Sequence, residues 1–479
     1  MELLDQIRAD LGAKYVITGT DAEAWTQDWM NVYHWQPLAV VRPASTQQVQ
    51  SIARSCHAAG IAMVPVGGNT GLTGATKAQD AVMISLDRMN AIREIKPNAQ
   101  VAIVESGAIL DSIHQAVDAH DLVFPLFFGA RGSAMIGGNL STNAGGSNVL
   151  RYGNTRDLCL GLEVVLADGR VMNLMSELHK DNTGLNLKHI LIGAEGTLGI
   201  ITTAVLRLYR KPLAYVTAMV GLQTLEDSIP LLNRLQNETG GGVEAFEYMP
   251  RRYIERHMDK IDGAMEPFDN AHDVNILVEV ATTRTSDLEQ DDTGTPKLQA
   301  ILETALMDMI EAGSAQDAVI AQNEAQRRVM WERRESAAEI TVGVAGSIDT
   351  DVAVPLDDVP TFLQQVSERV QAIDPDGQEF YIAHLGDGNL HYTFYPSDTS
   401  GVFKEPITEA IEDVVLALNG SFSAEHGIGL SKRNSMARRK DPVALEMMQA
   451  VKSAFDPKNL MNPGKVYPDW CQLKNLGPA

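Results

Sequence analysis

The segment HLGDGNLHY, residues 384–392, places two histidines on either side of a short turn. Its central Asp387-Gly388 pair is typical of a two-residue β-hairpin turn, because both residues tolerate the backbone angles that such a turn needs. In that hairpin His384 faces His391 directly across the strands, with Cβ atoms about 5 Å apart on one face. Two imidazoles so placed can chelate one metal ion, and they can equally be an ordinary cross-strand pair on a solvated face.

A second segment, SAEHGIGLSKR at residues 423–433, places a carboxylate beside another histidine in a glycine-flanked turn. Together with His384 and His391, Glu425 forms a set of two imidazoles and one carboxylate. Such a set suits Zn²⁺ or Mn²⁺ and leaves coordination positions open for a substrate. The adjacent His426 has two interpretations: a structural histidine next to a ligand, or a general base, since a neutral imidazole can accept a hydroxyl proton near pH 7.

Two glycine-rich loops indicate a large nucleotide cofactor. PVGGNTGLTGAT (65–76) follows an expected strand and has four glycines within eight residues, so that successive backbone N–H groups can turn toward one anion. It fits neither a G-x-G-x-x-G nor a Walker pattern. The second loop, IGGNLSTNAGG (136–146), adds Asn139, Ser141, Thr142 and Asn143, short polar side chains that suit a heterocycle and phosphates.

The segments above are expected to be positioned by strands and helices that alternate along the chain. Strands are expected at 38–43 and 61–66 around a helix at 45–60, in which Ser45 and Gln48 are placed for a capping box. A further strand and helix fill 100–122, and strands are expected at 161–170 and 197–209. Lys211-Pro212 makes a plausible domain boundary. Beyond it, strands such as 215–222 and 274–281 alternate with helical stretches, the acidic tract 289–296 is expected to be a solvated loop, and the chain from about residue 436 is helical before an apolar tail.

Length and composition restrict the class of protein. A chain of 479 residues with a net charge of −23 is expected to form two or three domains, and it should be repelled by nucleic acid and by anionic membranes. Cys56, Cys159 and Cys471 are few, odd in number and far apart, which fits a reducing compartment without disulfides. The chain has no stretch apolar enough for a membrane span, and its start lacks the features of a signal peptide. We therefore expect a cytoplasmic protein.

Seven segments occur in the order, and at about the spacing, of one enzyme family: PVGGNTGLTGAT, GSAMIGGNLSTNAGG, LRYG with LGLEVVLADG, KDNTGLNLKHILIGAEGTLGIIT, HLGDGNLHY, SAEHGIGLSKR and DPKNLMNPGKVYP. In these segments the chain resembles the FAD-linked D-2-hydroxyacid dehydrogenases, a family that includes D-lactate and D-2-hydroxyglutarate dehydrogenases and the glycolate oxidase flavin subunit. The resemblance implies an α+β fold of the vanillyl-alcohol-oxidase type. Residues 1–212 would form a two-subdomain FAD-binding domain, residues 213–435 an antiparallel-sheet cap domain for substrate and metal, and residues 436–479 a segment returning to the FAD domain.

The resemblance also implies site residues. A divalent metal, zinc or manganese, would bind His384, His391 and Glu425, with His426 as the catalytic base. Because the first loop has Asn69 and no histidine to tether the flavin, FAD should be non-covalent. The expected FAD-binding residues are Pro65, Gly67, Gly68, Asn69, Thr70, Gly71, Leu72, Gly132, Ser133, Gly137, Gly138, Asn139, Thr142, Asn143, Gly146, Glu195, Gly196, Ile200 and Asn462.

The residues expected to recognise the substrate depart from part of the family. Arg334 matches the family's carboxylate-binding arginine, although Arg333 leaves this assignment open by one residue and a surface salt bridge is the alternative. Hydroxyglutarate-type relatives have Thr, Lys and Asn where this chain has Ala338, Asp349 and Thr393. An aspartate would repel a distal carboxylate, so these residues favour a D-lactate-like monoacid.

Several alternatives remain open from the sequence. The LRYG, LGLEVVLADG and KDNTG segments look more like the hydroxyglutarate branch, so a D-2-hydroxyglutarate dehydrogenase is the second candidate. A non-catalytic flavin-binding subunit of a glycolate-oxidase-like complex is the third. The electron acceptor would be a partner such as a quinone or an electron-transfer flavoprotein, and a homodimer is one arrangement left open.

Overall fold

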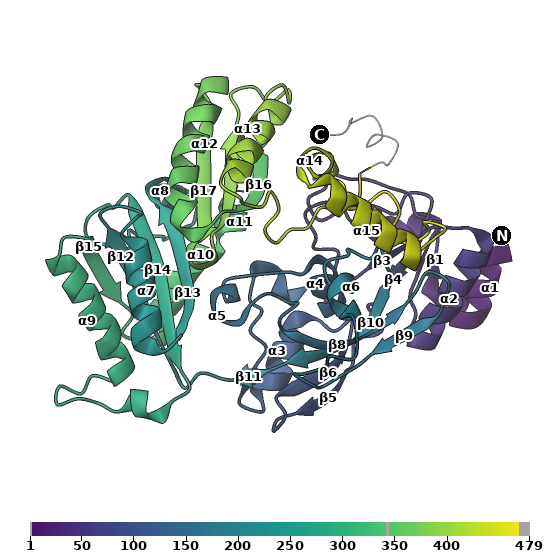
Figure 1. The fold of residues 1–479 in the computed structure, drawn as a ribbon, viewed down its shortest axis with the longest axis horizontal. Coiled ribbons are helices and arrows are strands. Elements are labelled where there is room, and N and C mark those ends of the chain that lie inside the picture. The colour runs from purple at the N-terminus through teal and green to yellow at the C-terminus, as the bar shows by residue number, and fades with distance from the viewer. Residues whose placement is uncertain (1, 342–343, 469–479) are drawn as a thin grey trace.

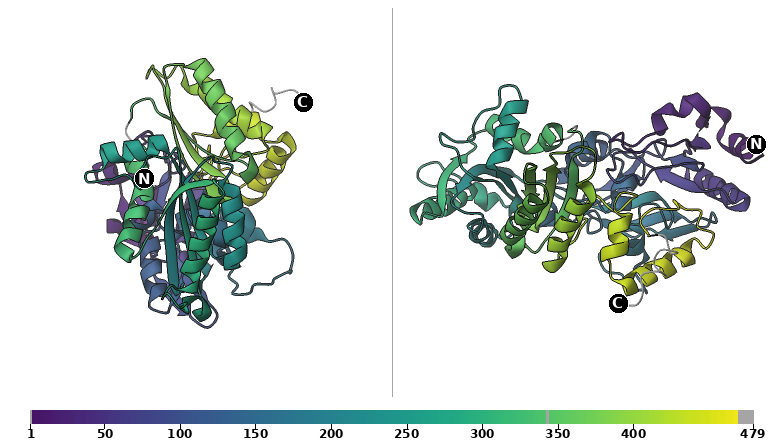
Figure 2. Two further views of the ribbon diagram at one scale, coloured as in Figure 1. Left: turned by 90° about the vertical axis from the view of Figure 1, so that its left-hand side faces the viewer. Right: turned by 90° about the horizontal axis from the view of Figure 1, so that it is seen from above.

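The computed structural model describes residues 2–341 and 344–468, which form two lobes (Figure 1). The first lobe contains residues 2–210 together with 442–468, and the second contains residues 214–417. Residues 418–441 run between them. The right-hand view of Figure 2 shows the same division from above.

The first lobe starts with a four-stranded sheet in the order β1-β2-β4-β3, formed by β1 (Val16–Ile17), β2 (Ala39–Val41), β3 (Met63–Val66) and β4 (Val82–Ser85). Both β2 and β3 pair in parallel with β4, and helix α2 (Thr46–Ala59) connects them. The Ser45 side chain caps α2 by accepting the Gln48 N–H, as the sequence predicts, and Gly60 ends the helix with a φ of 67°. Helix α1 (Glu2–Leu11) packs beside α2.

A five-stranded antiparallel sheet completes the first lobe, in the order β5-β6-β10-β8-β9. Its strands are β5 (Ile92–Lys96), β6 (Val101–Glu105), β8 (Cys159–Val165), β9 (Val171–Leu174) and β10 (Ile200–Arg207). Its helices are α3 (Leu110–Asp118), α4 (Ile136–Thr142), α5 (Val149–Tyr152) and α6 (Leu187–Leu191), and a small ladder pairs β7 (Leu122–Val123) with β11 (Tyr209–Arg210). Val165 and Ile200 pack into the core of the four-stranded sheet, so the two sheets of this lobe share apolar contacts.

The second lobe is built on a seven-stranded antiparallel sheet in the order β15-β12-β14-β13-β17-β18-β16. The strands are β12 (Ala214–Leu222), β13 (Val243–Pro250), β14 (Val274–Thr282), β15 (Ala315–Ile320), β16 (Ile348–Ala353), β17 (Gln378–His384) and β18 (Asn389–Tyr395). Helices α7 (Ser228–Thr239), α9 (Lys297–Glu311), α12 (Val359–Ile373) and α13 (Lys404–Ala417) bury one face of the sheet. Helices α8 (Arg251–Lys260), α10 (Glu324–Glu335) and α11 (Ala337–Thr341) pack on the other face.

The C-terminal part of the chain returns to the first lobe. After α14 (Arg433–Arg439), helix α15 (Pro442–Phe455) lies on the five-stranded sheet, coloured yellow in Figure 1. Met461 then forms a parallel bridge with Met63 of β3. Lys452 is buried, pairs with Asp456 at 2.6 Å and donates to the Thr197 carbonyl at 2.8 Å, so this return is fixed by polar as well as apolar contacts.

The lobes also meet through α5, which carries the LRYG segment. The buried carboxylate of Glu244 on β13 accepts hydrogen bonds from Asn148, Arg151 and Tyr152 at 2.6–2.9 Å. Leu150 packs where a side chain at Gly386 would otherwise stand, in the turn between β17 and β18. The histidine hairpin of the second lobe is therefore held directly against the first.

The predicted α+β class is confirmed, and so are the helix at 45–60 and the strands around it. Cys56 and Cys159 are buried free thiols, and burial raises the pKa of each to about 12. Cys471 lies outside the described residues. Among the helices that the structure describes, none has both the length and the apolar character needed to cross a membrane.

Candidate active site

The hairpin of β17 and β18 does not have the predicted register. Ile382 is the residue that pairs with His391, and a 3₁₀ turn at Leu385–Asp387 connects the two strands. The prediction that His384 pairs directly with His391 is therefore wrong. The Leu385 side chain is buried, and residues 385–388 form a longer connection that buries it in place of a two-residue turn. Because side chains alternate along a strand, both histidines still share one face as diagonal neighbours, with ring centroids 5.4 Å apart.

His391, Glu425 and His426 come together where the loop at residues 423–429 meets β18 and the edge strand β16. His391 Nε2 lies 3.4 Å from Glu425 Oε1, and the His391 and His426 rings stack with centroids 5.4 Å apart. Burial, together with His384 and His426 nearby, lowers the pKa of His391 well below its ordinary value. A neutral imidazole beside a carboxylate is the form in which these side chains bind a divalent metal.

Asp351 is a further member of this cluster that the sequence reasoning missed. It lies on β16 directly opposite His391, and one ligand atom from each of Asp351, His391, Glu425 and His426 falls within 4.8 Å of the others. Its Oδ2 accepts the backbone N–H groups of Glu425 at 3.0 Å and His426 at 2.8 Å, whereas its buried Oδ1 has no hydrogen-bond partner among the described residues. Two imidazoles and two carboxylates, one of which has an unpartnered buried oxygen, fit a divalent cation.

His384 lies beside this cluster and is held by a second buried carboxylate. Its Nδ1 is 2.9 Å from Glu247 of β13, which also accepts Arg334 Nε at 2.7 Å. Burial alone would lower the pKa of His384, but the Glu247 carboxylate raises it, while His384 and Arg334 keep the pKa of Glu247 low against the effect of burial. Arg334 reaches the His384 ring through Nη2, whereas Arg333 donates to the Met265 carbonyl, so Arg334 is the arginine that faces the hairpin.

Two of the three positions that set substrate choice in the resemblance, Asp349 and Thr393, lie on the same face of the sheet as the cluster, and the third, Ala338, lies on helix α11. Asp349 and Thr393 are opposite each other on β16 and β18, and Thr393 Oγ1 donates to Asp349 Oδ1 at 2.8 Å. Ser347 donates to the other carboxylate oxygen at 2.9 Å. Asp349 lies two residues before Asp351, and Thr393 lies two residues after His391. The Asp349 carboxylate is therefore next to the cluster, on the side away from the turn between β17 and β18.

The two glycine loops meet in the first lobe. A Cβ at Gly68 would overlap the carbonyl of Ser133, and one at Gly67 would come within 3.3 Å of Met135. Gly196, with a φ of 72°, packs against Pro65 in the same way. These contacts bring together three stretches that are far apart in the sequence, and they require positions without a side chain.

The predicted FAD residues differ in exposure, and two of them have polar atoms without a partner. Buried are Gly137, Asn139, Gly146, Glu195, Gly196, Ile200 and Asn462; partly buried are Pro65, Gly67, Gly68, Asn69, Thr70, Gly138, Thr142 and Asn143; exposed are Gly71, Leu72, Gly132 and Ser133. Among the described side chains, the buried Oδ1 atoms of Asn139 and Asn462 accept no hydrogen bond. A polar ligand along these loops would supply the missing donors, so the residues fit a dinucleotide cofactor.

The second glycine loop contacts the cluster of Asp351, His391, Glu425 and His426. A Cβ at Gly145 would stand 2.9 Å from Glu425 Oε2, so this glycine allows the carboxylate of the 423–429 loop to approach. The carboxylate of Glu195, one of the predicted FAD residues, is turned toward the same loop and accepts the N–H groups of Ile428 and Gly429. The candidate cofactor path and the candidate metal cluster therefore adjoin.

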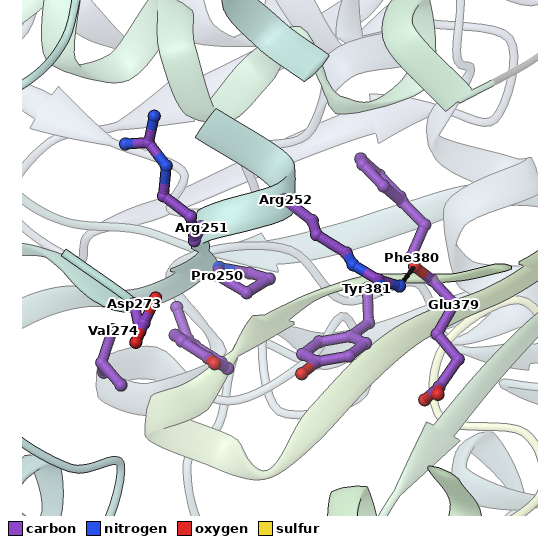
Figure 3. A pocket seen from close by; sticks show the side chains of 9 residues that line it. Pro250, Arg251, Arg252, Asp273, Val274, Glu379, Phe380 and Tyr381 are labelled. Atoms are coloured by element: carbon purple, nitrogen blue, oxygen red, sulfur yellow. Dashed lines mark hydrogen bonds between the residues drawn. The ribbon is translucent and has the colours of Figure 1, made fainter. Parts of the chain in front are cut away.

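A separate pocket of about 240 Å³ lies where β13 and β17 diverge after pairing over only two positions (Figure 3). Tyr248, Tyr381 and Arg252 are among its lining side chains, and the Arg252 guanidinium donates to the Glu379 carbonyl. None of the predicted site residues lines it, so we do not assign the chemistry to this pocket.

Comparisons with known proteins match both lobes. The family described as FAD linked oxidases, C-terminal domain, matches residues 211–466, and the FAD binding domain family matches residues 37–175. The chain is 33% identical to the D-2-hydroxyglutarate dehydrogenase of Stutzerimonas stutzeri over 472 residues, which cover 97% of this chain and 98% of that protein. It is 31% identical to the D-2-hydroxyglutarate–pyruvate transhydrogenase of Saccharomyces cerevisiae over 450 residues, covering 92% and 89% of the two chains.

Among solved structures, p-cresol methylhydroxylase with substrate bound is similar, with a TM-score of 0.73 and 16% identity over 98% of this chain and 96% of that one. This likeness concerns the fold alone. It confirms the predicted architecture, in which an FAD-binding lobe is joined to an antiparallel-sheet lobe.

Proposed function

This chain belongs to the family of FAD-linked oxidases that includes the D-2-hydroxyglutarate dehydrogenases, and from this premise we propose that it oxidises a small D-2-hydroxy acid to the 2-oxo acid with FAD and a divalent cation. The observation that carries the proposal is the meeting of His391, Glu425 and His426 against Gly145 of the second glycine loop. Acid–base groups and metal ligands thereby adjoin the loops proposed to bind the flavin.

FAD would be held without a covalent bond by the loops at Pro65–Leu72, Gly132–Gly146 and Gly193–Ile201 together with Asn462. The unpartnered amide oxygens of Asn139 and Asn462 support this assignment. Bound FAD supplies the redox chemistry, the acceptance of a hydride from the substrate Cα.

The cation, zinc or manganese, would be held by His391 and Glu425 with His384 beside them, and the unpartnered oxygen of Asp351 makes it a further candidate ligand. It supplies Lewis acidity toward the substrate hydroxyl. His426 would take the hydroxyl proton, since its backbone N–H is fixed by Asp351 and its Nε2 lies 3.8 Å from Glu425. Arg334 would orient the substrate carboxylate with its planar guanidinium, which Glu247 holds in place.

For the substrate we propose a D-lactate-like monoacid. The Asp349 carboxylate supports this choice, because it would repel the distal carboxylate of hydroxyglutarate where relatives of that type have a lysine. D-2-hydroxyglutarate is the second candidate, favoured by the names of the two relatives described above. An electron acceptor such as a quinone or an electron-transfer flavoprotein would then reoxidise the flavin.

The test is anaerobic reduction of the flavin by a panel of D-2-hydroxy acids that includes D-lactate and D-2-hydroxyglutarate, before and after dialysis against EDTA. We expect rapid bleaching by one or both acids, loss of that reaction after EDTA and recovery when zinc or manganese is added. The variant His391→Ala should not recover with metal. A yellow protein that none of the acids bleaches, with metal present, would instead support the non-catalytic flavin-binding subunit.

A further inference from the structure

The loop at residues 423–429 carries both Glu425 and His426, and a buried carboxyl group accepts backbone hydrogen bonds at each end of it. Asp351 of the second lobe accepts the N–H groups of Glu425 and His426, and Glu195 of the first lobe accepts those of Ile428 and Gly429. Within a few residues, the loop thus donates four backbone hydrogen bonds, two to one carboxyl group in each lobe. Those to Asp351 are charge-assisted, and such bonds are roughly twice as strong as neutral ones.

The hydrogen bonds to Glu195 require the backbone of the loop to lie close to its carboxyl group. Glu195 Oε1 lies 2.7 Å from the Ile428 nitrogen and Oε2 lies 2.8 Å from the Gly429 nitrogen. Gly427 and Gly429 both have positive φ angles, and a Cβ at Gly427 would come within 2.8 Å of the Glu195 carboxylate. Just beyond, the Leu430 N–H donates to the carbonyl of Thr73, which belongs to the first glycine loop. Both anchors on this side therefore belong to the stretches proposed to bind FAD.

The backbone of Glu195 contacts the other stretches that are proposed to bind FAD. Its N–H donates to the carbonyl of Ser141 in α4 at 2.8 Å, and its carbonyl accepts the Asn462 side chain at 2.7 Å. The next residue, Gly196, packs on Pro65 at the start of the first glycine loop. Any ligand that orders these loops also orders Glu195, and through its carboxylate the loop with Glu425 and His426.

We propose that FAD binding and metal binding are energetically coupled through the 423–429 loop, with Glu195 as the positioning residue that transmits the coupling. This inference rests on the proposed function, because it takes the metal to bind at Glu425. Coupling between two binding sites is reciprocal, so the metal must tighten FAD by the same factor by which FAD tightens the metal.

The coupling can be measured as FAD release from the full-length holoprotein, followed by the fluorescence of the released flavin. The dissociation constant of FAD is compared with zinc present and after zinc removal by EDTA. We expect zinc removal to weaken FAD binding about tenfold, within the usual range of such couplings. An unchanged dissociation constant in the wild-type protein overturns the inference without any variant.

Glu195→Gln assigns the effect to this residue. The measurement is made at pH 8, above the pKa of about 7 that burial gives Glu195, so that the native side chain accepts both N–H groups as a carboxylate. The amide keeps one oxygen acceptor but turns its own N–H groups toward the second backbone N–H, so one of the two hydrogen bonds is lost while the shape is kept. In this variant the effect of zinc on FAD binding should fall to within about twofold of none. Persistence of the full wild-type effect would overturn the role of Glu195.

Glu105→Gln is the matched control, because Glu105 is also a first-lobe carboxylate that accepts a backbone N–H, but its bonds stay within the β5–β6 hairpin. It should keep the full zinc effect. If Glu195→Gln does not fold, Glu195→Asp retains the charge, shortens the reach and should reduce the effect in the same direction. A wild-type protein that shows no coupling but intact flavin reduction by a D-2-hydroxy acid overturns this inference alone, whereas a wild-type protein that binds no zinc overturns the proposed metal site as well.

Discussion

Asp351→Asn is the substitution that most directly tests the arrangement of the acid–base residues. Asp351 is only 1% exposed, and a single oxygen, Oδ2, fixes the backbone of both Glu425 and His426. Burial opposes its ionisation, but His426 and Lys432 keep its pKa far below the ordinary value, so the native residue is a carboxylate. Asparagine has nearly the same shape and removes only the charge.

The size of the effect follows from the bonds that are weakened. Each charge-assisted hydrogen bond contributes about 1.5–3 kcal/mol, and a neutral acceptor retains about half of that, so the two N–H groups account for a loss of roughly 1.5–3 kcal/mol. Lys432, whose Nζ is 3.6 Å from Oδ2, also loses its anionic neighbour. Because a displacement of about 1 Å in a reacting group can lower a rate about 100-fold, we expect kcat to fall by that order with a small change in KM.

Two measurements test this expectation, urea unfolding for stability and anaerobic stopped-flow flavin reduction for the chemical step. The matched control is Asp374→Asn, because Asp374 is equally buried in the second lobe and accepts the N–H and hydroxyl of Ser397, but touches none of the cluster. Both variants should lose a similar stability, and only Asp351→Asn should lose turnover. Flavin reduction within twofold of wild type in Asp351→Asn would refute the positioning role of this carboxylate.

Three further predictions concern neighbouring residues. Burial raises the pKa of Glu195 to about 7 from 4.5, so the folded protein keeps a proton that the unfolded chain releases. The stabilising contribution of this residue should be fully present below about pH 4.5 and should fall by about 3 kcal/mol as the pH rises to 7. Glu195→Gln should flatten this slope in urea unfolding measured across that pH range, and an unchanged slope would contradict it. Arg334→Lys keeps the charge but loses the planar guanidinium that contacts Glu247 and His384, so kcat/KM for the hydroxy acid should fall about 10- to 100-fold, and a smaller fall would assign Arg334 to structure alone. Asp349→Lys should raise kcat/KM for D-2-hydroxyglutarate relative to D-lactate at least about tenfold, and an unchanged ratio would place the distal carboxylate elsewhere.

Local sequence signals predicted much of the fold. The helix from Thr46 to Ala59 was readable from its Ser45 cap, its apolar spacing and Gly60, all of which act within a few residues. The hairpin between β17 and β18 was predicted with the wrong register, because its turn depends on distant contacts. Leu385 is buried in the core of the sheet, and Gly388 packs against the carbonyl of Val354. Turn propensity alone cannot include such contacts.

Most of the candidate site was predicted from segments that contain glycine or histidine, and Arg334 was predicted from the resemblance. Asp351 and Glu247 were missed, although each is an acidic residue within an apolar strand, in TDVAV and in VEAFEYM. An ionised carboxylate at a buried strand position requires donors or cations around it, and that requirement is visible in the sequence. The donors are not, since Glu247 is paired with Arg334 from 87 residues away and Asp351 with backbone groups about 75 residues away.

The oxygen atoms of the cluster also argue for a cation. Asp351 Oδ1 is buried and has no hydrogen-bond partner among the described residues, and Glu425 Oε1 lies 3.4 Å from His391 Nε2 and 3.8 Å from His426 Nε2. The nearby cations Arg334 and Lys432 already have carboxylate neighbours, Glu247 and Asp351. A divalent ion among these carboxylate oxygens and imidazole nitrogens would bind the free oxygen of Asp351 and the carboxylate of Glu425 at once, which is the coordination that such ligands provide.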